Sequence, residues 1–246
     1  IEMITIGNFF FKYRNLIFPF FGLLIFIPSP HVFNEQMFGP NYYSIPLTLG
    51  LMVAISGQLI RAITIGLKYI VRGGKNKKVY AEDLVTVGFF NHCRNPLYVG
   101  NILMLTGVGI LSNSLYFLLI VVPLFCFIYQ AIVLAEENYL RGKFGPQYEN
   151  YFHEVNRWIP SFKGIKATMA SMEFNWRRYI AREYNTIYLL LLSMIIILMT
   201  HHPQLIKLAT TEKLEVFLVS FLILSVIYLV VRYLKKSNKL KPRAVI

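Results

Sequence analysis

The chain has 246 residues, of which 56% are hydrophobic and 15% are charged, and its mean hydropathy is +0.52. A soluble core of this size does not need so much apolar surface, so the composition indicates a protein whose solvent is the lipid bilayer. The formal charge of +13 is compatible with nucleic-acid binding. Because the basic residues flank apolar runs and no nucleic-acid module is recognisable, membrane topology explains the charge better, and we expect no nucleic-acid partner.

Apolar runs predict about six membrane-spanning helices, since a span needs about 20 mostly apolar residues. The first run follows Lys12 and Arg14, contains Pro19 and lacks a small-residue cleavage pattern, so we expect a retained span rather than a signal peptide. Only Ser112-Asn113-Ser114 separates the third and fourth runs, which predicts a tight helical hairpin over 98–135. The predicted spans are approximately 15–33, 45–67, 98–113, 115–135, 185–200 and 214–232.

Lysine and arginine counts predict the orientation, because cytoplasmic loops carry an excess of these residues. Two precede the first span, six lie in 68–95, eight lie in 136–184 and six lie from 232 onward. The alternate loops hold none at 34–44 and two at 201–213. We therefore expect both termini and the two long polar segments to face the cytoplasm.

The polar segment 136–184 is not expected to cross the membrane. Its pattern predicts an amphipathic helix, a turn at Phe144-Gly145-Pro146 and a second short helix to about 156. The basic and aromatic stretch 165–183 then suits the headgroup layer. We expect an all-α bundle in which a core, 1–164, is followed by an interfacial helix and two more spans in 165–246.

The segment 88–101 enters a predicted span from the cytoplasmic side. Pro96 suits the first turn of a helix, where its missing N–H costs nothing. Arg94 and the free N–H groups of that turn would form an anion site suited to a carboxylate. The alternative is that Arg94 only extends toward the interface and Pro96 only starts a helix.

Two adjacent acids, Glu136 and Glu137, follow the apolar run 115–135. A carboxylate at a helix C-terminus opposes the macrodipole, so a compensating charge is expected. Arg94 or a bound cation would supply it. The alternative is that both acids are solvated at the membrane boundary.

Other polar residues have both a packing and a functional interpretation. Tyr148 and Tyr151 share a helical face with Phe144, a spacing that suits packing more than an aromatic cage. Arg61 lies within a span, and intramembrane charge normally faces a bundle interior and marks function, although it could instead extend to the interface.

The histidines and cysteines show no metal-ligand or disulfide pattern, so we predict no metal site and interpret the histidines as surface or interfacial residues. These residues are His31, His92, His153, His201, His202, Cys93 and Cys126.

Taken together, these segments resemble the superfamily of isoprenylcysteine carboxyl methyltransferases and phospholipid methyltransferases, which are membrane enzymes. That family has a glycine followed by Arg-His-Pro-x-Tyr-x-Gly, a long helical hairpin, Glu-Glu-x-x-Leu, Phe-Gly-x-x-Tyr-x-x-Tyr and a closing proline. The order and spacing agree over about 50–160, and the last two spans lie outside the resemblance. The matching residues are Gly88, Arg94-Asn95-Pro96-Leu97-Tyr98-Val99-Gly100, Glu136, Glu137, Leu140, Phe144, Gly145, Tyr148, Tyr151 and Pro160.

The resemblance implies S-adenosylmethionine as methyl donor, in a cytoplasm-facing pocket formed by the hairpin 98–135 and the segments 88–101 and 136–160. A lipid-like acceptor would reach this pocket from the bilayer. Methyl transfer is an in-line displacement, so alignment and exclusion of water can supply most of the catalysis. We expect Arg94, Glu137 and Arg61 to be catalytic, and we expect the cofactor to contact Gly88, Arg94, Asn95, Pro96, Tyr98, Gly100, Glu136, Glu137, Tyr148 and Tyr151.

The expected contacts follow from the charges of the cofactor. Arg94 would take its carboxylate or orient an acidic acceptor, one of the two acids would take its ammonium, and the tyrosines would pack on adenine or face the sulfonium. Asn95 departs from the family pattern because it replaces the usual histidine. An amide supplies hydrogen bonds but no proton exchange.

Two other classes of protein remain open at this stage. Membrane sterol reductases that use a nicotinamide dinucleotide phosphate have a related C-terminal half, although they typically have more spans before the motif. A non-enzymatic membrane protein would use Arg61, Arg94 and the acids as structural ion pairs. The sequence does not distinguish a prenylated cysteine carboxylate, a phospholipid amine, a quinone or another isoprenoid as the acceptor, and it does not predict the oligomeric state.

Overall fold

The computed structural model describes residues 2–68, 78–202 and 209–240. Within these ranges the chain forms helices joined by loops, and an isolated bridge pairs His31 with Ser114. Five of the described helices are long and apolar enough to cross a membrane: Glu2–Phe26, Ser44–Leu67, Phe117–Phe144, Trp176–His201 and Thr210–Lys236. A further apolar helix, Pro96–Leu111, is shorter. The predicted all-α membrane bundle is confirmed, and the chain is an integral membrane protein.

The elements follow one another without a sheet in the described ranges. In chain order they are α1 (Glu2–Leu23), η1 (Leu24–Phe26), α2 (Glu35–Phe38), α3 (Ser44–Leu67), η2 (Gly88–Asn91), α4 (Pro96–Leu111), the π-helical turn η3 (Phe117–Val121), α5 (Val122–Phe144), α6 (Pro146–Glu154), α7 (Ile165–Ala170), α8 (Trp176–His201) and α9 (Thr210–Lys236).

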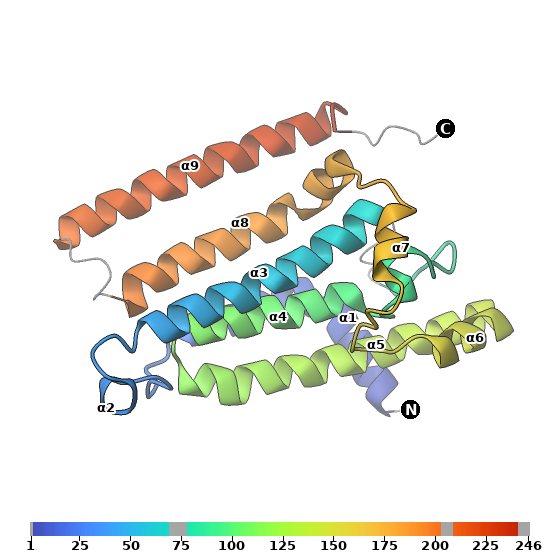
Figure 1. The fold of residues 1–246 in the computed structure, drawn as a ribbon, viewed down its shortest axis with the longest axis horizontal. Coiled ribbons are helices and arrows are strands. Elements are labelled where there is room, and N and C mark those ends of the chain that lie inside the picture. The colour runs from blue at the N-terminus through green and yellow to red at the C-terminus, as the bar shows by residue number, and fades with distance from the viewer. Residues whose placement is uncertain (1, 69–77, 203–208, 241–246) are drawn as a thin grey trace.

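The long helices lie side by side. Figure 1 shows α9, α8, α3, α4 and α5 in succession, with α1 behind them. Helix α3 packs on α4, α1 on α5, α8 on α3 and α4, and α9 on α8. The start of α1 and the end of α9 lie at the same end of the bundle as α6 and α7 (Figure 1). The two ends of the described chain therefore lie on one side, and its identity as the cytoplasmic side stays a prediction.

The first span is displaced from its predicted position. The sequence suggests 15–33, whereas the helical span is Glu2–Phe26. Pro28 cannot donate a backbone hydrogen bond, which favours an end to the helix before it. The following segment is bound to the turn between α4 and α5, where Asn113 Nδ2 donates to Phe33 O (2.7 Å) and Asn113 Oδ1 accepts from Phe33 N (2.8 Å).

Helices α4 and α5 form the predicted hairpin. At its turn Asn113 has a left-handed backbone (φ 56°), a conformation that asparagine tolerates better than most residues. The fourth span does not end near 135 as predicted but continues to Phe144. Glu136 and Glu137 therefore lie in the last turns of a long helix.

Small residues let α3 and α4 approach closely, as they do at many helix interfaces in membranes. A Cβ on Gly107 would lie 2.4 Å from Ala54 N, and a Cβ on Gly57 would lie 2.5 Å from Gly100 O. The same seam ends at Arg61, whose Cγ would lie 2.5 Å from a Cβ on Gly100. Gly100 thus brings the arginine-bearing part of α3 against α4.

The basic stretch that follows the core is divided between two helices. The sequence suggests one interfacial helix over 165–183, whereas α7 ends at Ala170 and α8 begins at Trp176. Asn175 caps α8, because its side-chain oxygen accepts from Arg178 N (2.9 Å). The basic residues of this stretch therefore lie in the first turns of a membrane-spanning helix.

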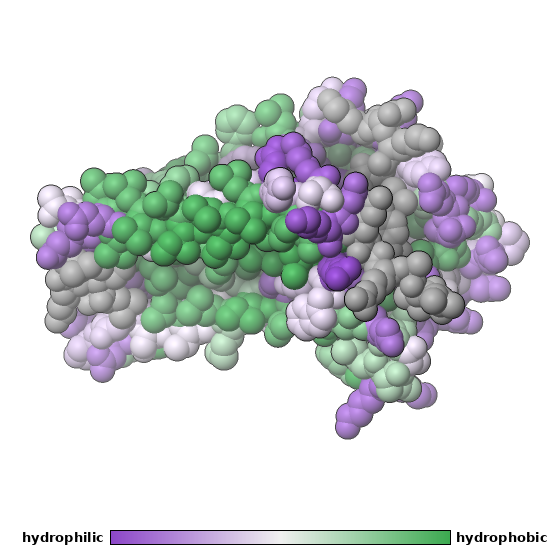
Figure 2. Space-filling view, turned by 90° about the horizontal axis from the view of Figure 1, so that it is seen from above, coloured by the Kyte–Doolittle hydropathy of each residue, from purple (hydrophilic) through white to green (hydrophobic). Residues whose placement is uncertain are grey.

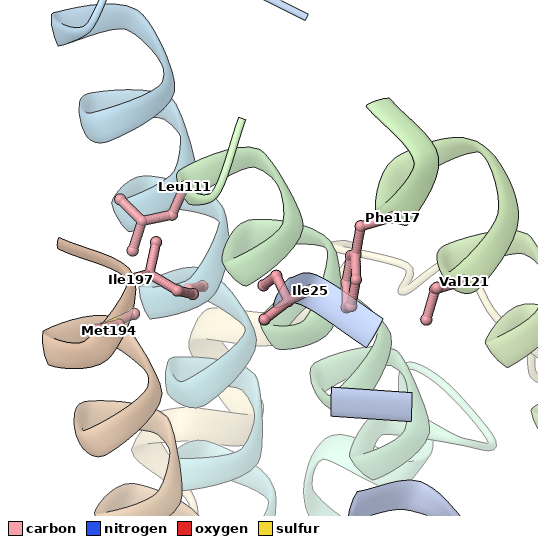
Figure 3. Packing of buried hydrophobic residues seen from close by; sticks show 7 residues of the cluster. Ile25, Leu111, Phe117, Val121, Met194 and Ile197 are labelled. Carbon is pink, nitrogen blue, oxygen red and sulfur yellow. The ribbon is translucent and has the colours of Figure 1, made fainter. Parts of the chain in front are cut away.

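The surface and the core both match a membrane setting. Figure 2 shows an apolar band between two polar ends, and the larger polar region lies at the end that holds α6 and α7. At the opposite end, buried side chains from η1, α4, η3 and α8 pack together, as Figure 3 shows for Ile25, Leu111, Phe117, Val121, Met194 and Ile197. This packing closes the bundle away from the polar end.

Candidate functional site

A cavity of about 730 Å³ lies where α4 begins and where α5 and α6 meet. Its size is in the usual range for a site that encloses a small-molecule ligand. Its walls come from α1, α3, α4, α5, α6 and α8 and from the loop 79–85. Most of the predicted site residues line it: Arg61, Arg94, Asn95, Pro96, Tyr98, Glu136, Glu137, Tyr148 and Tyr151.

One wall is an ion-pair cluster centred on Glu137. Arg94 Nη2 lies 3.2 Å from Glu137 Oε1, and Arg157 Nη2 lies 2.8 Å from Glu137 Oε2. Arg94 Nη1 also donates to the backbone oxygens of Phe152 (2.5 Å) and Val155 (2.6 Å). The expected pairing of Arg94 with one of the two acids is therefore present, and it fastens α4 and α5 to the end of α6.

These bonds leave Arg94 little capacity to hold a ligand. A guanidinium has five donors, and Arg94 uses four of them on Glu137 and on two backbone carbonyls. Its side chain is only 8% exposed. The geometry gives Arg94 and Glu137 a role in shaping the cavity, and their direct contact with a ligand stays a prediction.

In the second charged cluster, a tyrosine hydroxyl lies between an arginine and a glutamate. Tyr98 hydroxyl donates to Glu136 Oε1 (2.6 Å), and Arg14 Nη1 donates to the same hydroxyl (3.3 Å). Arg14 also lies over the Phe11 ring, 4.3 Å from its centroid. Among the described residues, neither Arg14 nor Glu136 forms an ion pair. The cavity therefore presents one cation and one anion, separated by a phenol.

A third polar group lies deeper in the span. Glu183 of α8 accepts two bonds from Arg61, at 2.7 and 2.8 Å. Arg61 Nη1 donates to Asn101 Oδ1 (2.6 Å), and Asn101 Nδ2 donates to Tyr129 hydroxyl (2.9 Å). The interface-extending interpretation of Arg61 is thus wrong, because the side chain is 7% exposed and paired within the bundle.

The aromatic pair of α6 packs against the outer part of the cavity. Tyr148 and Tyr151 cluster with Val155, and Leu140 and Phe144 pack around them. Tyr151 hydroxyl donates to Phe90 O (2.8 Å). Burial raises the pKa of both tyrosines above the usual value, so both stay protonated at neutral pH. The predicted packing face is confirmed, and the two rings also line the cavity.

Two predicted glycines lie behind the cavity wall rather than on it. Gly88 has a left-handed backbone (φ 67°), starts η2 and lies near Lys68 and Met172. Gly100 lies in the seam between α3 and α4. Neither is among the lining residues, so we expect both to shape the backbone, and their predicted contact with cofactor stays untested.

Asn95 and Pro96 have the local roles that the sequence suggests. Pro96 lies in the first turn of α4, and Asn95 precedes it. Asn95 Nδ2 donates to Arg157 O (3.2 Å). The amide that replaces the family histidine therefore ties the start of α4 to the segment after α6.

Two histidines are buried, which corrects the surface interpretation. His92 and His202 are each 2% exposed. His92 Nδ1 donates to Ser161 O (2.8 Å), since a carbonyl only accepts, and Nε2 lies 2.8 Å from Thr168 Oγ1. Cys93 beside it is fully buried, and desolvation raises its pKa to about 11. His92 thus joins the end of η2 to α7, whereas His202 bonds to Leu111 O at the end of α4.

Sequence reasoning missed several cavity residues. Arg14 and Phe18 come from α1, Asn185 comes from α8, and the loop 79–85 covers the outer part. Lys143 Nζ holds this loop by donating to Ala81 O and to Glu82 O. No local motif marks these residues, because only the packing of α1 and α8 brings them to the site.

Within the described ranges no group of three or more His, Cys, Asp or Glu could hold a metal ion.

Comparison with known proteins gives a family match and two relatives. Residues 46–147 match the model of the phospholipid methyltransferase family. The chain is 28% identical over 142 residues to the cobalt-zinc-cadmium resistance protein CzcN of Cupriavidus metallidurans, which covers 56% of this chain and 60% of that protein. It is 30% identical over 112 residues to the nickel-cobalt-cadmium resistance protein NccN of Alcaligenes xylosoxydans xylosoxydans, which covers 46% of this chain and 47% of that protein. The chain thus matches three-fifths or less of these relatives' length. No solved structure matches the chain significantly.

The fold and the site define a class of protein: an integral membrane helical bundle with a large charged cavity at one end. The segment 46–147 contains most of α3 and all of α4 and α5 and, with them, Arg61, Arg94, Glu136 and Glu137. This segment matches the phospholipid methyltransferase family, which is part of the isoprenylcysteine carboxyl methyltransferase-like superfamily. The resemblance stated from the sequence motifs is confirmed.

Proposed function

We propose that this protein is an S-adenosylmethionine-dependent methyltransferase that acts on a lipid-like acceptor held in the membrane. The observation that carries the proposal is the pair of charged side chains, Arg14 and Glu136, on either side of Tyr98 hydroxyl in the cavity. The family match supports the reaction class. The metal-resistance names of the two relatives add neither a donor nor an acceptor to this proposal.

The residues present fit the methyl donor. One end of S-adenosylmethionine is an amino acid with a carboxylate and an ammonium. Arg14 offers a guanidinium that is not spent on a protein carboxylate, and Glu136 offers a carboxylate that is not spent on a protein cation. Arg14 would hold the carboxylate and Glu136 the ammonium, in charge-assisted bonds. This assignment replaces Arg94 by Arg14 as the expected carboxylate ligand.

Aromatic side chains suit the other charged part of the donor. Tyr98 and Tyr129 stack with ring centroids 4.9 Å apart, and both line the cavity. A sulfonium is attracted to aromatic faces as other cations are. Tyr148, Tyr151 and Leu140 form the more apolar outer part of the cavity, which would receive the adenine.

The chain's own residues would act by position. When bound, the donor supplies an electrophilic methyl group whose C–S bond breaks, with its electron pair kept by sulfur, as the acceptor bonds to that carbon. Arg94, Glu137 and Arg157 fix the wall between α4, α5 and α6. The loop 79–85, held by Lys143, would exclude water from the outer part. Alignment of donor and acceptor, together with exclusion of water from the cavity, lowers the activation barrier by roughly several kcal/mol.

The acceptor would enter from the bilayer, and the cavity would open to the cytoplasm. Phe11 and Phe18 of α1 give the cavity an apolar wall within a membrane-spanning helix. The basic residues Lys235 and Lys236 in the last turn of α9, which ends on this side of the bundle, support a cytoplasmic position for it. A cofactor made in the cytoplasm and an acceptor dissolved in lipid would thus meet at the depth of Tyr98.

Methyl transfer by the purified protein tests this proposal. We expect incubation with methyl-labelled S-adenosylmethionine and a membrane lipid extract to place label in the lipid fraction. Arg94→Ala and Glu137→Ala should abolish transfer because each disconnects α4 and α5 from α6, whereas Glu149→Gln on the exposed face of α6 should retain it. Folded wild-type protein that transfers no label, or that oxidises a reduced nicotinamide dinucleotide phosphate instead, contradicts the proposal.

A further inference from the structure

Basic side chains gather where the start of α8 meets the end of α9. Lys235 Nζ lies 4.8 Å from the centroid of the Tyr184 ring, and the rings of Tyr184 and Tyr228 have centroids 5.2 Å apart. The last turns of α9 therefore lie beside the first turns of α8, as Figure 1 also shows. We call the basic residues of these turns the α8–α9 basic patch: Arg177, Arg178, Arg182, Arg232, Lys235, Lys236 and Lys239.

Part of this patch is not used by the protein itself. Arg177, Lys236 and Lys239 are exposed, and among the described residues their side chains form no hydrogen bond or ion pair. Arg178, in contrast, donates to Gly66 O (2.6 Å) at the end of α3. The patch thus contains both a cation that holds helices together and cations that are open to a ligand.

The acids of α8 and α9 do not offset this charge. Glu183 of α8 is buried and paired with Arg61 of α3. Glu212 and Glu215 lie near the start of α9, at the other end of that helix. With Glu173 before α8 as the nearest further acid in sequence, the patch keeps a positive excess that attracts an anion.

Exposed aromatic and apolar side chains place the patch at the depth of lipid headgroups. Trp176 is 65% exposed and Tyr233 is 64% exposed, and such residues prefer the boundary between hydrocarbon and water. One turn further into the span, Leu229 and Val230 are also exposed. A ligand that meets the cations here also meets an apolar surface, so the fitting partner has an anionic head and acyl chains.

We propose that the α8–α9 basic patch binds the phosphodiester headgroup of an anionic phospholipid, which bridges the two helices. Clusters of Lys and Arg at the end of a membrane span recognise such headgroups. None of the residues of α9 is buried, so this helix rests on α8 through a shallow contact. A headgroup shared by cations of both helices would add charge-assisted bonds between them. The patch lies outside the segment 46–147, and the proposal does not depend on methyl transfer.

Tryptophan fluorescence tests the proposal, because Trp176 is next to Arg177 in the first turn of α8. The chain has two tryptophans, so Trp158→Phe leaves Trp176 as the reporter. The purified full chain, in phosphatidylcholine vesicles, receives increasing amounts of phosphatidylglycerol or phosphatidylcholine with bromine near the headgroup end of the acyl chains. We expect brominated phosphatidylglycerol to quench half-maximally at a roughly tenfold lower mole fraction, since each basic residue near the headgroups contributes about fivefold in affinity.

Charge removal separates a local site from the general attraction of a basic surface. In the same background, Arg177→Gln and Lys236→Gln should each reduce the preference for phosphatidylglycerol by roughly three- to fivefold, and the double variant should retain almost none. Lys163→Gln removes one charge from an exposed loop position before α7, at the same polar end of the bundle. This control should change the preference by less than about 1.5-fold, because salt screens distant charges.

Inorganic phosphate distinguishes a lipid headgroup from a free anion as the ligand. Added at constant ionic strength, it should not relieve the quenching, because it has no acyl chains to meet the apolar surface. Equal quenching by the two brominated lipids, an equal loss of preference in Lys163→Gln, or displacement by inorganic phosphate would each overturn the proposal.

Native mass spectrometry of the wild-type protein makes the same comparison if Trp158→Phe does not fold. Phosphatidylglycerol should stay bound at collision energies that remove phosphatidylcholine. Equal retention of the two lipids would contradict a headgroup site on α8 and α9.

Discussion

Three arginines line the cavity, and their partners separate their roles. Arg61 is paired with Glu183 and Arg94 with Glu137, so both are neutralised by the protein. Arg14 bonds only to a neutral phenol and packs on an aromatic ring. Because a charge that is already paired gains little from a ligand, Arg14 is the cation best suited to bind an anionic group.

Of the three arginines, Arg14 was the one for which the sequence provided no indication of a role in the site. It precedes an apolar run and is explained there as a basic flank of the first span. Arg94, in contrast, stands beside Pro96 in a motif. The motif located the cavity and the pairing of Arg94 with an acid, but the bonds from Arg94 to the carbonyls of α6 depend on tertiary packing. Local pattern therefore identified the region of the site but not its free charges.

Replacement of Arg14 tests this assignment. Arg14→Gln should weaken S-adenosylhomocysteine binding by roughly 10- to 100-fold, because a charge-assisted bond to its carboxylate is lost. Lys12→Gln removes the same charge two residues away on an exposed position and should have less than a threefold effect. Isothermal titration of both variants provides the comparison. Equal affinity in Arg14→Gln and wild type would remove Arg14 from the donor site.

Helix boundaries were predicted well where apolar runs end in local signals. The second span, predicted at 45–67, is Ser44–Leu67, and the turn of the hairpin lies at the predicted Ser112-Asn113-Ser114. The first span and the end of the fourth were misplaced. Glu136 lies within the long helix α5, where Tyr98 of α4 donates to it across the bundle. A count of apolar residues cannot anticipate such a contact.

The seam between α3 and α4 gives a prediction at the level of elements. Gly107→Ala should destabilise the bundle by about 1–3 kcal/mol, because the new Cβ would lie 2.4 Å from Ala54 N and force the helices apart. Gly142→Ala on α5 meets nothing within 4 Å and should be neutral or slightly stabilising. Thermal unfolding in detergent checks both. A similar midpoint for the two variants would contradict the close approach of α3 and α4.

The whole molecule combines a family core with helices that the family match does not cover. Helices α3, α4 and α5 carry the motif residues, while α1 contributes Arg14 and α8 contributes Asn185 to the cavity and Glu183 behind it. The sequence predicted the division of the chain at 164, and that division stays a prediction. The contacts show that the part after 164 is in direct polar contact with α3.

Cysteine labelling tests the predicted orientation. Asn150→Cys on α6 and Ser237→Cys after α9 should react with a membrane-impermeant maleimide only after cells are permeabilised, whereas Gln36→Cys in α2 should react in intact cells. The parent chain is the background, and its Cys93 should stay unreactive because burial raises its pKa to about 11. The reverse pattern would place the cavity on the outer face.

The most direct test of the account is a titration of the purified wild-type protein in detergent with S-adenosylmethionine, S-adenosylhomocysteine and a reduced nicotinamide dinucleotide phosphate. We predict saturable binding of the first two and none of the third. Folded protein that binds neither sulfur compound, or that binds the dinucleotide instead, would contradict the assignment of the cavity to a methyl donor.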